Sequence, residues 1–186
     1  MSCGALVLVV GPSGAGKDSL IAGARERLAG DARFIFSRRV VTRPPTAYEN
    51  HDTTTPDEFA ALFVSGRFAL HWQAHGLSYG LPQEVIEQAE AGAVVVCNVS
   101  RGIVAPARAQ FGKVAAVYVD AQPELRKARI AARGRDAPSG SRVDQSRAEL
   151  TPAACEFVID NSGALETAVN AFTSVLLAIA EDRTHA

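Results

Sequence analysis

The chain has 186 residues, of which 47% are hydrophobic, and its formal net charge at pH 7 is −1. The length suits one domain, 1–186, and the charge argues against nucleic-acid binding, because a polyanion partner usually requires a basic surplus. The three cysteines are far apart and have no histidine at metal spacing, so neither a disulfide framework nor a zinc site is expected. A cytoplasmic location is expected, because the early apolar run at 5–10 is too short to span a bilayer and has no basic leader.

Hydrophobic periodicity and turn residues predict alternating strands and helices along the chain. The predicted elements are, in order, a strand at 5–10, a glycine-rich loop and a helix to about 28, an extended segment at 33–41, a polar loop at 42–55, a helix at 56–63, a strand at 68–74, a turn around 76–82, a helix at 83–91, a strand at 93–97, a helix at 104–111, a strand at 114–120, a helix at 123–133, a strand at 157–160 and a helix at 164–180. This alternation predicts an α/β fold with a doubly wound parallel sheet, whose ligands bind at the carboxyl ends of the strands.

The loop after the first strand matches the Walker A phosphate loop in both spacing and context. Its glycines allow backbone turns that a Cβ would forbid, so several main-chain N–H groups can converge on a phosphate at a helix N-terminus. Lys17 adds a flexible point charge for the outer phosphates. The loop therefore predicts a nucleoside triphosphate site made of Gly11, Pro12, Ser13, Gly14, Ala15, Gly16, Lys17, Asp18 and Ser19.

One position of the motif departs from the Walker pattern. The residue after Lys17 is normally Ser or Thr, whose hydroxyl binds magnesium, but here it is Asp18, with Ser19 one place late. A carboxylate is also a hard oxygen ligand, so Asp18 either holds the metal, directly or through water, or caps the helix as an acidic first-turn residue. We favour the metal.

Arginine is used far more often than lysine, with sixteen Arg and three Lys. Planar guanidinium groups suit phosphate oxygens, and two clusters stand out: Arg38, Arg39 and Arg43, and then Arg129, Arg133, Arg135, Arg142 and Arg147. The stretch 134–141 within the second cluster is small, polar and broken by Pro138 and two glycines. This composition predicts a mobile segment between arginines.

The order of these parts resembles the guanylate kinase branch of the nucleoside monophosphate kinases over nearly the whole chain. The shared parts are the phosphate loop, the Thr42-Arg43-Pro44 segment, the Tyr79-Gly80 turn and an Arg-rich lid. The resemblance implies a P-loop kinase fold, with an acceptor-binding region at about 34–82 and a lid at about 133–147.

Three residues that read guanine in that family are replaced here. Arg39 stands where the family has a serine, Leu70 where it has a glutamate, and Leu81 where it has a hydroxyl residue. Where the family has a second phosphate-binding arginine, this chain has Thr46. A purine facing leucines would leave buried polar atoms unpaired, at about 1–3 kcal/mol each. The acceptor is therefore expected to have more phosphate groups than GMP and less of a heterocyclic base.

The same residues resemble the ribose 1,5-bisphosphate phosphokinase family of phosphonate catabolism. The matching segments are the phosphate loop with its Asp18, 38–44, 49–52, 69–80, 98–101 and 160–163. The resemblance implies phosphorylation of ribose 1,5-bisphosphate by ATP with magnesium, which yields 5-phosphoribosyl 1-diphosphate and ADP. The acceptor oxygen is a phosphate oxygen, so charge neutralisation and positioning replace a strong base.

The resemblance also implies roles for individual residues. Lys17 and magnesium would bridge the donor phosphates, and Arg133, Arg135 and Arg142 would close from the lid onto the transferred group. The acceptor would be held by Arg39, Arg43, Arg101 and Tyr79, with Glu49 and His75 as further candidates.

Several of these residues have structural alternatives. Arg101 is either an acceptor ligand or a solvent-facing charge before a helix. Glu49 and Asp52 either bind ribose hydroxyls or a second metal, or are solvated loop acids. His71 and His75 either contact a sugar hydroxyl or are packed or solvated. Asn98 and Ser100 either orient metal-bound water or cap the next helix, and Asp160-Asn161 lies where an adenine pocket would be bordered.

Two other functions remain open at the level of sequence. One is a divergent guanylate kinase or another nucleoside monophosphate kinase, and the other is a guanylate-kinase-like binding module without catalysis. Lys17 and the Arg-rich lid argue against the module, because an interaction domain needs neither. The expected partners are ATP and a small phosphorylated sugar, with no nucleic acid and no membrane, in a monomer or a homodimer.

Overall fold

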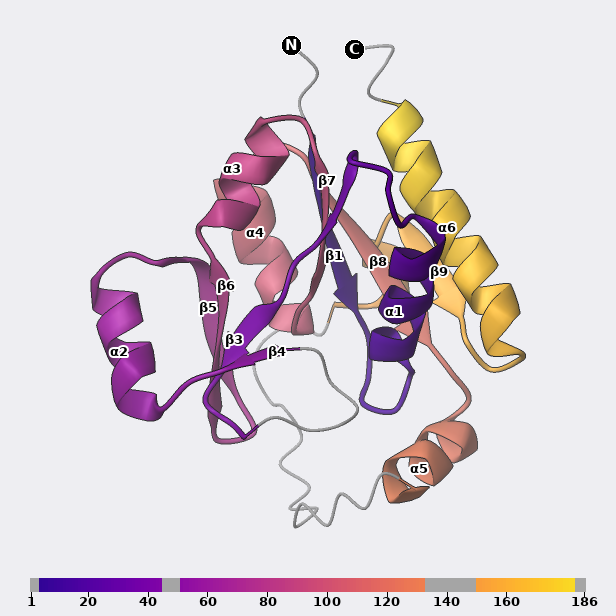
Figure 1. The fold of residues 1–186 in the computed structure, drawn as a ribbon. Helices are drawn as coiled ribbons and strands as arrows, with labels where there is room; N and C mark the ends of the chain where they lie inside the picture. Colours follow the sequence, from indigo (N-terminus) through magenta and orange to yellow (C-terminus); the bar gives the residue numbers. More distant parts are fainter. Residues whose placement is uncertain (1–3, 45–50, 133–149, 183–186) are drawn as a thin grey trace.

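The structure is a computed structural model that describes residues 4–44, 51–132 and 150–182 (Figure 1). A five-stranded parallel sheet forms its centre, in the order β2-β7-β1-β8-β9. These strands are β1 (Ala5–Val10), β2 (Phe34–Phe36), β7 (Val94–Asn98), β8 (Val114–Asp120) and β9 (Phe157–Asp160). The predicted α/β fold with a parallel sheet is confirmed.

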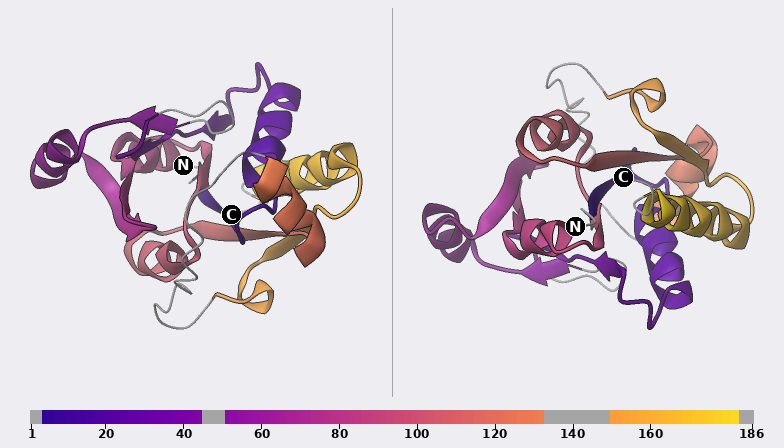
Figure 2. Two further views of the ribbon diagram at one scale, coloured as in Figure 1. Left: turned by 90° about the horizontal axis from the view of Figure 1, so that it is seen from below. Right: turned by 90° about the horizontal axis from the view of Figure 1, so that it is seen from above.

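The central strand β1 contributes side chains to two separate core clusters. Successive side chains of a strand point to opposite faces, and every residue of β1 is at most 1% exposed. The side chains of Ala5, Val7 and Val9 pack in the cluster that contains α1 (Lys17–Arg27) and α6 (Leu165–Glu181), while those of Leu6, Leu8 and Val10 pack in the cluster that contains α3 (Glu84–Glu90) and α4 (Val104–Gln110). The sheet is therefore doubly wound, with helices on both faces (Figure 2).

A second, smaller sheet lies to one side of the parallel sheet (Figure 1). Its strand order is β4-β3-β6-β5, in which β3 and β4 are parallel and the other pairs are antiparallel. The strands are β3 (Arg39–Val41), β4 (His51–Thr53), β5 (Phe68–Ala74) and β6 (Leu77–Pro82), and α2 (Pro56–Val64) connects β4 to β5. All four strands lie within 34–82, the region for which the sequence predicts acceptor binding, whereas β2 of that region belongs to the parallel sheet.

In this region one local prediction was wrong and two were incomplete. The segment expected to be a turn around 76–82 is strand β6, because β3 and β5 pair with both of its edges. The extended segment 33–41 is two strands, β2 and β3, that belong to different sheets. The polar loop expected at 42–55 contains the short strand β4, which pairs with β3.

The remaining elements are short or stand apart from the sheets. Helix α5 (Pro123–Ala132) follows β8, and two 3-10 turns, η1 (Arg101–Ile103) and η2 (Pro152–Ala154), precede α4 and β9. Across the described ranges, no helix combines the length and the apolar character needed to cross a bilayer. The predicted lid at 133–147 lies outside the described residues, as do Arg133, Arg135 and Arg142.

Candidate active site

The phosphate loop connects the carboxyl end of β1 to the amino end of α1. Gly11 and Gly14 have positive φ angles of 143° and 79°. A Cβ would lie 2.0 Å from the carbonyl oxygen of Val119 at Gly11, and 2.6 Å from that of Arg126 at Gly14. Both positions therefore require glycine, for backbone conformation and for close approach to β8 and α5.

Lys17 is folded over this loop. Its Nζ donates to the carbonyl oxygens of Gly11, at 2.8 Å, and Pro12, at 3.1 Å. The ammonium group thus lies beside the glycine-rich backbone that the sequence assigned to the phosphates. An anion in the loop would meet both the main-chain N–H groups at the start of α1 and this cation.

Asp18 lies next to the carboxyl end of a neighbouring strand. The Asn98 Nδ2 group, at the end of β7, donates to Asp18 Oδ1 at 2.8 Å. Asn98 Oδ1 is buried and accepts no hydrogen bond. Asp18 is in the first turn of α1. The N-cap residue of this helix is Gly16, and no side chain caps the helix by a hydrogen bond. Two oxygen-bearing side chains therefore meet at the edge where the strands end.

Asn161 ties the phosphate loop to the end of the last strand. Its Nδ2 donates to the Ala15 carbonyl at 2.8 Å, and its own N–H donates to the Asp120 carbonyl at 2.8 Å. The residue is 1% exposed. The sequence placed Asn161 only near a nucleotide pocket, and a 146-residue separation from Ala15 left no local signal of this contact.

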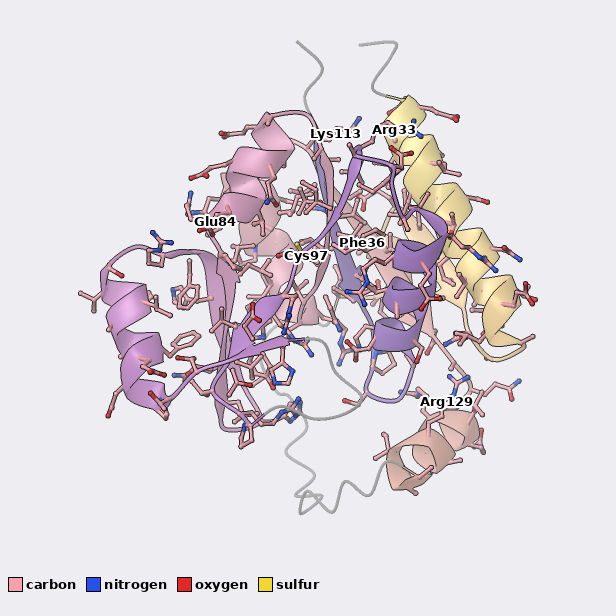
Figure 3. The ribbon with its side chains drawn as sticks, viewed as in Figure 1. Arg33, Phe36, Glu84, Cys97, Lys113 and Arg129 are labelled. Atoms are coloured by element: carbon pink, nitrogen blue, oxygen red, sulfur yellow. The ribbon has the colours of Figure 1, made fainter. Side chains whose placement is uncertain are left out.

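Helix α5 is held against the same loop by Arg129. The guanidinium donates to the Asn161 carbonyl at 3.0 Å and, at 3.5 Å, to the Ala15 carbonyl. Figure 3 shows Arg129 on α5, below the loop that precedes α1. Arg129 therefore fixes the position of α5 relative to the phosphate loop.

The acceptor candidates are distributed along the small sheet. Arg39 is on β3 and Tyr79 on β6, and the Arg39 Cζ atom lies 5.6 Å from the centre of the Tyr79 ring. Arg43 follows β3 and is half-buried, as is Arg101 at the start of η1. The structure therefore places Arg39 beside Tyr79. Glu49 lies outside the described residues.

His75 is at the tip of the β5–β6 hairpin. The hairpin pairs Ala74 with Leu77, so His75 and Gly76 form a two-residue turn with φ angles of 52° and 73°. Two positive φ values characterise the turn that suits the twist of a hairpin. The His75 side chain is exposed.

Three other candidates have structural partners. His71 stacks edge-on against Phe63 of α2, with ring centroids 4.4 Å apart. Asp52 pairs with Arg38 at 2.9 Å, and the Arg38 guanidinium also donates to the His51 carbonyl at 3.0 Å. Ser100 makes no side-chain capping bond to η1. These contacts favour the structural interpretation of His71 and Asp52 and do not support the capping role of Ser100.

The two leucines that replace guanine-reading groups are buried. Leu70 is 5% exposed and Leu81 is 0% exposed, and both pack in the cluster that contains α3 and α4. They are paired across β5 and β6 and form an apolar base on one face of the small sheet. A purine edge would find no polar partner on them.

The cysteine nearest to the site is inert. Burial raises the pKa of the Cys97 thiol to about 12, so the thiol stays protonated at neutral pH. Cys97 precedes Asn98 on β7 and lies in the interior of the molecule (Figure 3). A thiolate nucleophile at this position is excluded.

The fold and these sites define a P-loop kinase of the guanylate kinase-like type. A guanylate kinase from Anaplasma phagocytophilum matches with a TM-score of 0.67 and 18% identity, over 95% of this chain and 86% of that one. No protein-family model matches the chain.

Sequence similarity to known proteins identifies the family within this class of kinases. The chain is 45% identical to "Ribose 1,5-bisphosphate phosphokinase PhnN" of Acidiphilium cryptum, over 94% of this chain and 93% of the relative. The protein of the same name from Methylobacterium radiotolerans is 55% identical over 71% of this chain and 75% of its own length. The chain belongs to the ribose 1,5-bisphosphate phosphokinase family and is a kinase.

Proposed function

We propose that the protein transfers the terminal phosphoryl group of ATP to the 1-phosphate of ribose 1,5-bisphosphate. A bond forms between an oxygen of the 1-phosphate and the γ-phosphorus, the bond from that phosphorus to the β–γ bridging oxygen breaks, and ADP leaves. The product is 5-phosphoribosyl 1-diphosphate. The observation that carries the proposal is the small sheet, where buried Leu70 and Leu81 and a cation, Arg39, replace groups that would read a purine.

The acceptor chemistry suits a site without a strong base. A phosphate oxygen is already anionic at neutral pH, so no proton has to be removed to make the nucleophile. The barrier then depends on bringing two anions together in line and neutralising the charge that develops between them. Arginines, a lysine and backbone N–H groups meet this requirement.

The donor phosphates would bind in the loop Gly11–Ser19. Backbone N–H groups at the start of α1 would surround the β-phosphate, and Lys17 would move from the carbonyls of Gly11 and Pro12 to the outer phosphates. Asn161 supports this by fixing the Ala15 carbonyl, so that the loop is ordered before the nucleotide arrives. Preorganisation of this kind lowers the cost of binding.

Asp18 and Asn98 fit a magnesium ion by their chemistry. A carboxylate and an amide oxygen without a hydrogen-bond partner are hard ligands, and magnesium takes few protein ligands besides phosphates and water. Among the described residues no group of three or more His, Cys, Asp or Glu is arranged to hold a metal, which agrees with such a sparse site. When bound, the ion would neutralise charge on the triphosphate, while Asn98 orients the Asp18 carboxylate.

The metal proposal is tested by Asp18→Ser, which restores the usual Walker hydroxyl. The magnesium concentration for half-maximal turnover should shift several-fold, and so should the magnesium dependence of ATP binding measured by calorimetry. Glu26→Ser, on the exposed side of the same helix, is the matched control. Unchanged magnesium dependence of both quantities would remove Asp18 from the metal site.

The acceptor and the transferred group would be held from two sides. Arg39, Arg43, Arg101 and Tyr79 would bind the phosphates of the sugar. Glu49 and His75 are assigned to the same substrate from sequence. The lid residues Arg133, Arg135 and Arg142 would close onto the phosphoryl group during transfer and exclude water.

The function is tested by incubating the protein with magnesium-ATP and ribose 1,5-bisphosphate and following the products by phosphorus NMR. A diphosphate on C1 of the ribose should appear in step with ADP. A parallel reaction with GMP reports on nucleotide kinase activity. Fast turnover of GMP with none of the sugar would refute the proposal.

A further inference from the structure

Three side chains from adjacent strands of the small sheet form a stacked column. Trp72 of β5 and Tyr79 of β6 have ring centroids 5.4 Å apart and an angle of 6° between their planes. On the other side, the Arg39 Cζ atom of β3 lies 5.6 Å from the centre of the Tyr79 ring. The Tyr79 ring is thus stacked on an indole and carries a guanidinium. We refer to Arg39, Tyr79 and Trp72 as the stacked column.

Strand register places all three residues on one face of the sheet. Trp72 is directly opposite Tyr79, and Tyr79 is directly opposite Val41. Arg39 is two residues before Val41 on the same strand, so its side chain leaves the sheet on the same face. Leu70 and Leu81, each two residues away from Trp72 and Tyr79 on the same strands, are paired with each other and belong to that face as well.

The column is most buried at its centre, and its indole packs against a core cluster. Trp72 packs against the core cluster that contains Leu70 and Leu81. Tyr79 is 8% exposed, whereas Trp72 and Arg39 are both half-buried. The phenol ring is therefore the most buried member of the column, enclosed between the indole and the guanidinium.

We propose that Trp72 is a positioning residue for the acceptor, which holds Arg39 in the orientation that binds a phosphate of the sugar. The inference rests on the proposed function and extends it to a residue that has no polar contact with the substrate. Trp72 acts through Tyr79, whose ring it supports.

The physical reason lies in the geometry of a guanidinium on an aromatic ring. A guanidinium that lies over an aromatic ring can direct its face to the ring and its N–H groups outward in its own plane, which is the arrangement of a bidentate bond to phosphate. The plane of the Tyr79 ring thus sets the direction of the Arg39 donors. Parallel stacking on the large surface of Trp72 restricts rotation of that ring.

The test compares Trp72→Phe and Trp72→Leu with the wild type. Trp72→Leu should raise the KM for ribose 1,5-bisphosphate about tenfold. Loss of an aromatic pair and misorientation of a cation each weaken binding by up to about tenfold. The KM for ATP should stay within about twofold. Trp72→Phe, which keeps a stacking ring, should recover most of the acceptor affinity.

A matched control removes an aromatic residue from the opposite face of the same sheet. Phe63 stacks on His71 and is 49% exposed, and Phe63→Leu should leave the KM for both substrates unchanged. A purely structural role of Trp72 would lower the folded fraction and kcat while leaving the acceptor KM of the folded enzyme unaltered. That result would overturn the inference.

A double-mutant cycle with Arg39→Lys separates positioning from general packing. Lysine keeps the charge but lacks the planar group, so Trp72→Leu should change the acceptor KM less than twofold in the Arg39→Lys background. Equal effects of Trp72→Leu in both backgrounds would contradict the coupling.

The wild type provides a test that needs no variant, because Trp72 is the only tryptophan of the chain. Its fluorescence should change saturably when ribose 1,5-bisphosphate is added without ATP. An unchanged spectrum at saturating sugar would overturn the inference. Absence of turnover by the wild type would overturn the proposed function as well, whereas normal turnover with equal acceptor KM in Trp72→Leu would overturn the inference alone.

Discussion

The phosphate loop and the small sheet, the two proposed substrate sites, are built from different kinds of groups. The loop consists of backbone groups fixed by close packing: Gly11 against Val119, Gly14 against Arg126, and Ala15 held by Asn161. The small sheet presents side chains on a strand surface, where Arg39 lies over the Tyr79 ring and the buried Leu70 and Leu81 are on the same face.

Under the proposed function, this difference predicts where substrate identity is determined. A backbone site recognises a phosphate whatever is attached to it, and altering it requires a change in the path of the chain. A side-chain site changes its ligand when individual residues change, while the sheet beneath stays the same. Under the proposed function, the donor side would therefore define the class of enzyme, and the acceptor side would define which phosphorylated compound it uses.

The largest effect is expected on the donor side, from Lys17→Ala. Removal of the cation from the outer phosphates should lower kcat by at least about 100-fold, because the charge stabilises the transition state. The melting temperature should stay close to that of the wild type. Lys113→Ala, a surface lysine paired with Asp182, is the control. Unimpaired turnover in Lys17→Ala would remove it from the mechanism.

The second prediction concerns the specificity of the acceptor site. The double variant Leu70→Glu with Arg39→Ser restores the residue types that read guanine in guanylate kinases. These changes should raise the KM for ribose 1,5-bisphosphate about tenfold or more and increase the affinity for GMP, which calorimetry can measure. Because Leu70 is buried, circular dichroism must first show that the variant is folded. Equal affinity for the sugar before and after would show that the pocket is elsewhere.

The third prediction tests whether the loop depends on a side-chain support. Asn161→Ala removes the 2.8 Å bond to the Ala15 carbonyl and leaves that buried group poorly satisfied. The free energy of unfolding should fall by about 1–3 kcal/mol and the KM for ATP should rise, with little change in the KM for the sugar. Asn170→Ala, on the exposed side of α6, should change neither KM. A larger effect on the sugar than on ATP would contradict the division between the two regions.

The smallest effect is expected in α2, beside the small sheet. Glu58 forms a capping box with Thr55, and the hydrogen bond from the Thr55 backbone lowers the pKa of the Glu58 carboxyl. Its contribution to stability is therefore present at neutral pH and is lost as the pH falls through the lowered pKa. Glu58→Ala should lower the melting temperature slightly at pH 7, and the difference should shrink toward pH 3. An unchanged difference at both pH values would contradict a charged cap.

The sequence predicted the parallel sheet because its signals are local. β1 is an uninterrupted apolar run followed by a phosphate loop, and β8 and β9 are found where their apolar runs predicted them. Strand β6 was missed because Gly80 and Pro82 suggest a turn, whereas tertiary pairing with β3 and β5 decides its conformation.

Residues of the candidate site that belong to a sequence motif were predicted. Contacts between residues that are far apart in the sequence were missed. Lys17 and Asp18 stand out by their place in the loop. The bonds from Asn98 to Asp18 and from Asn161 to Ala15 join residues 80 and 146 positions apart, so no periodicity or spacing reveals them. The stacked column depends on the register of three strands, and the sequence alone did not single out Trp72.

The central claim is that the acceptor side reads a phosphorylated sugar and rejects a nucleobase. The most direct measurement is the ratio of kcat/KM for ribose 1,5-bisphosphate to that for GMP, with saturating magnesium-ATP and the same enzyme preparation. The account predicts a ratio of at least about 100 in favour of the sugar. A ratio of one or below would contradict it.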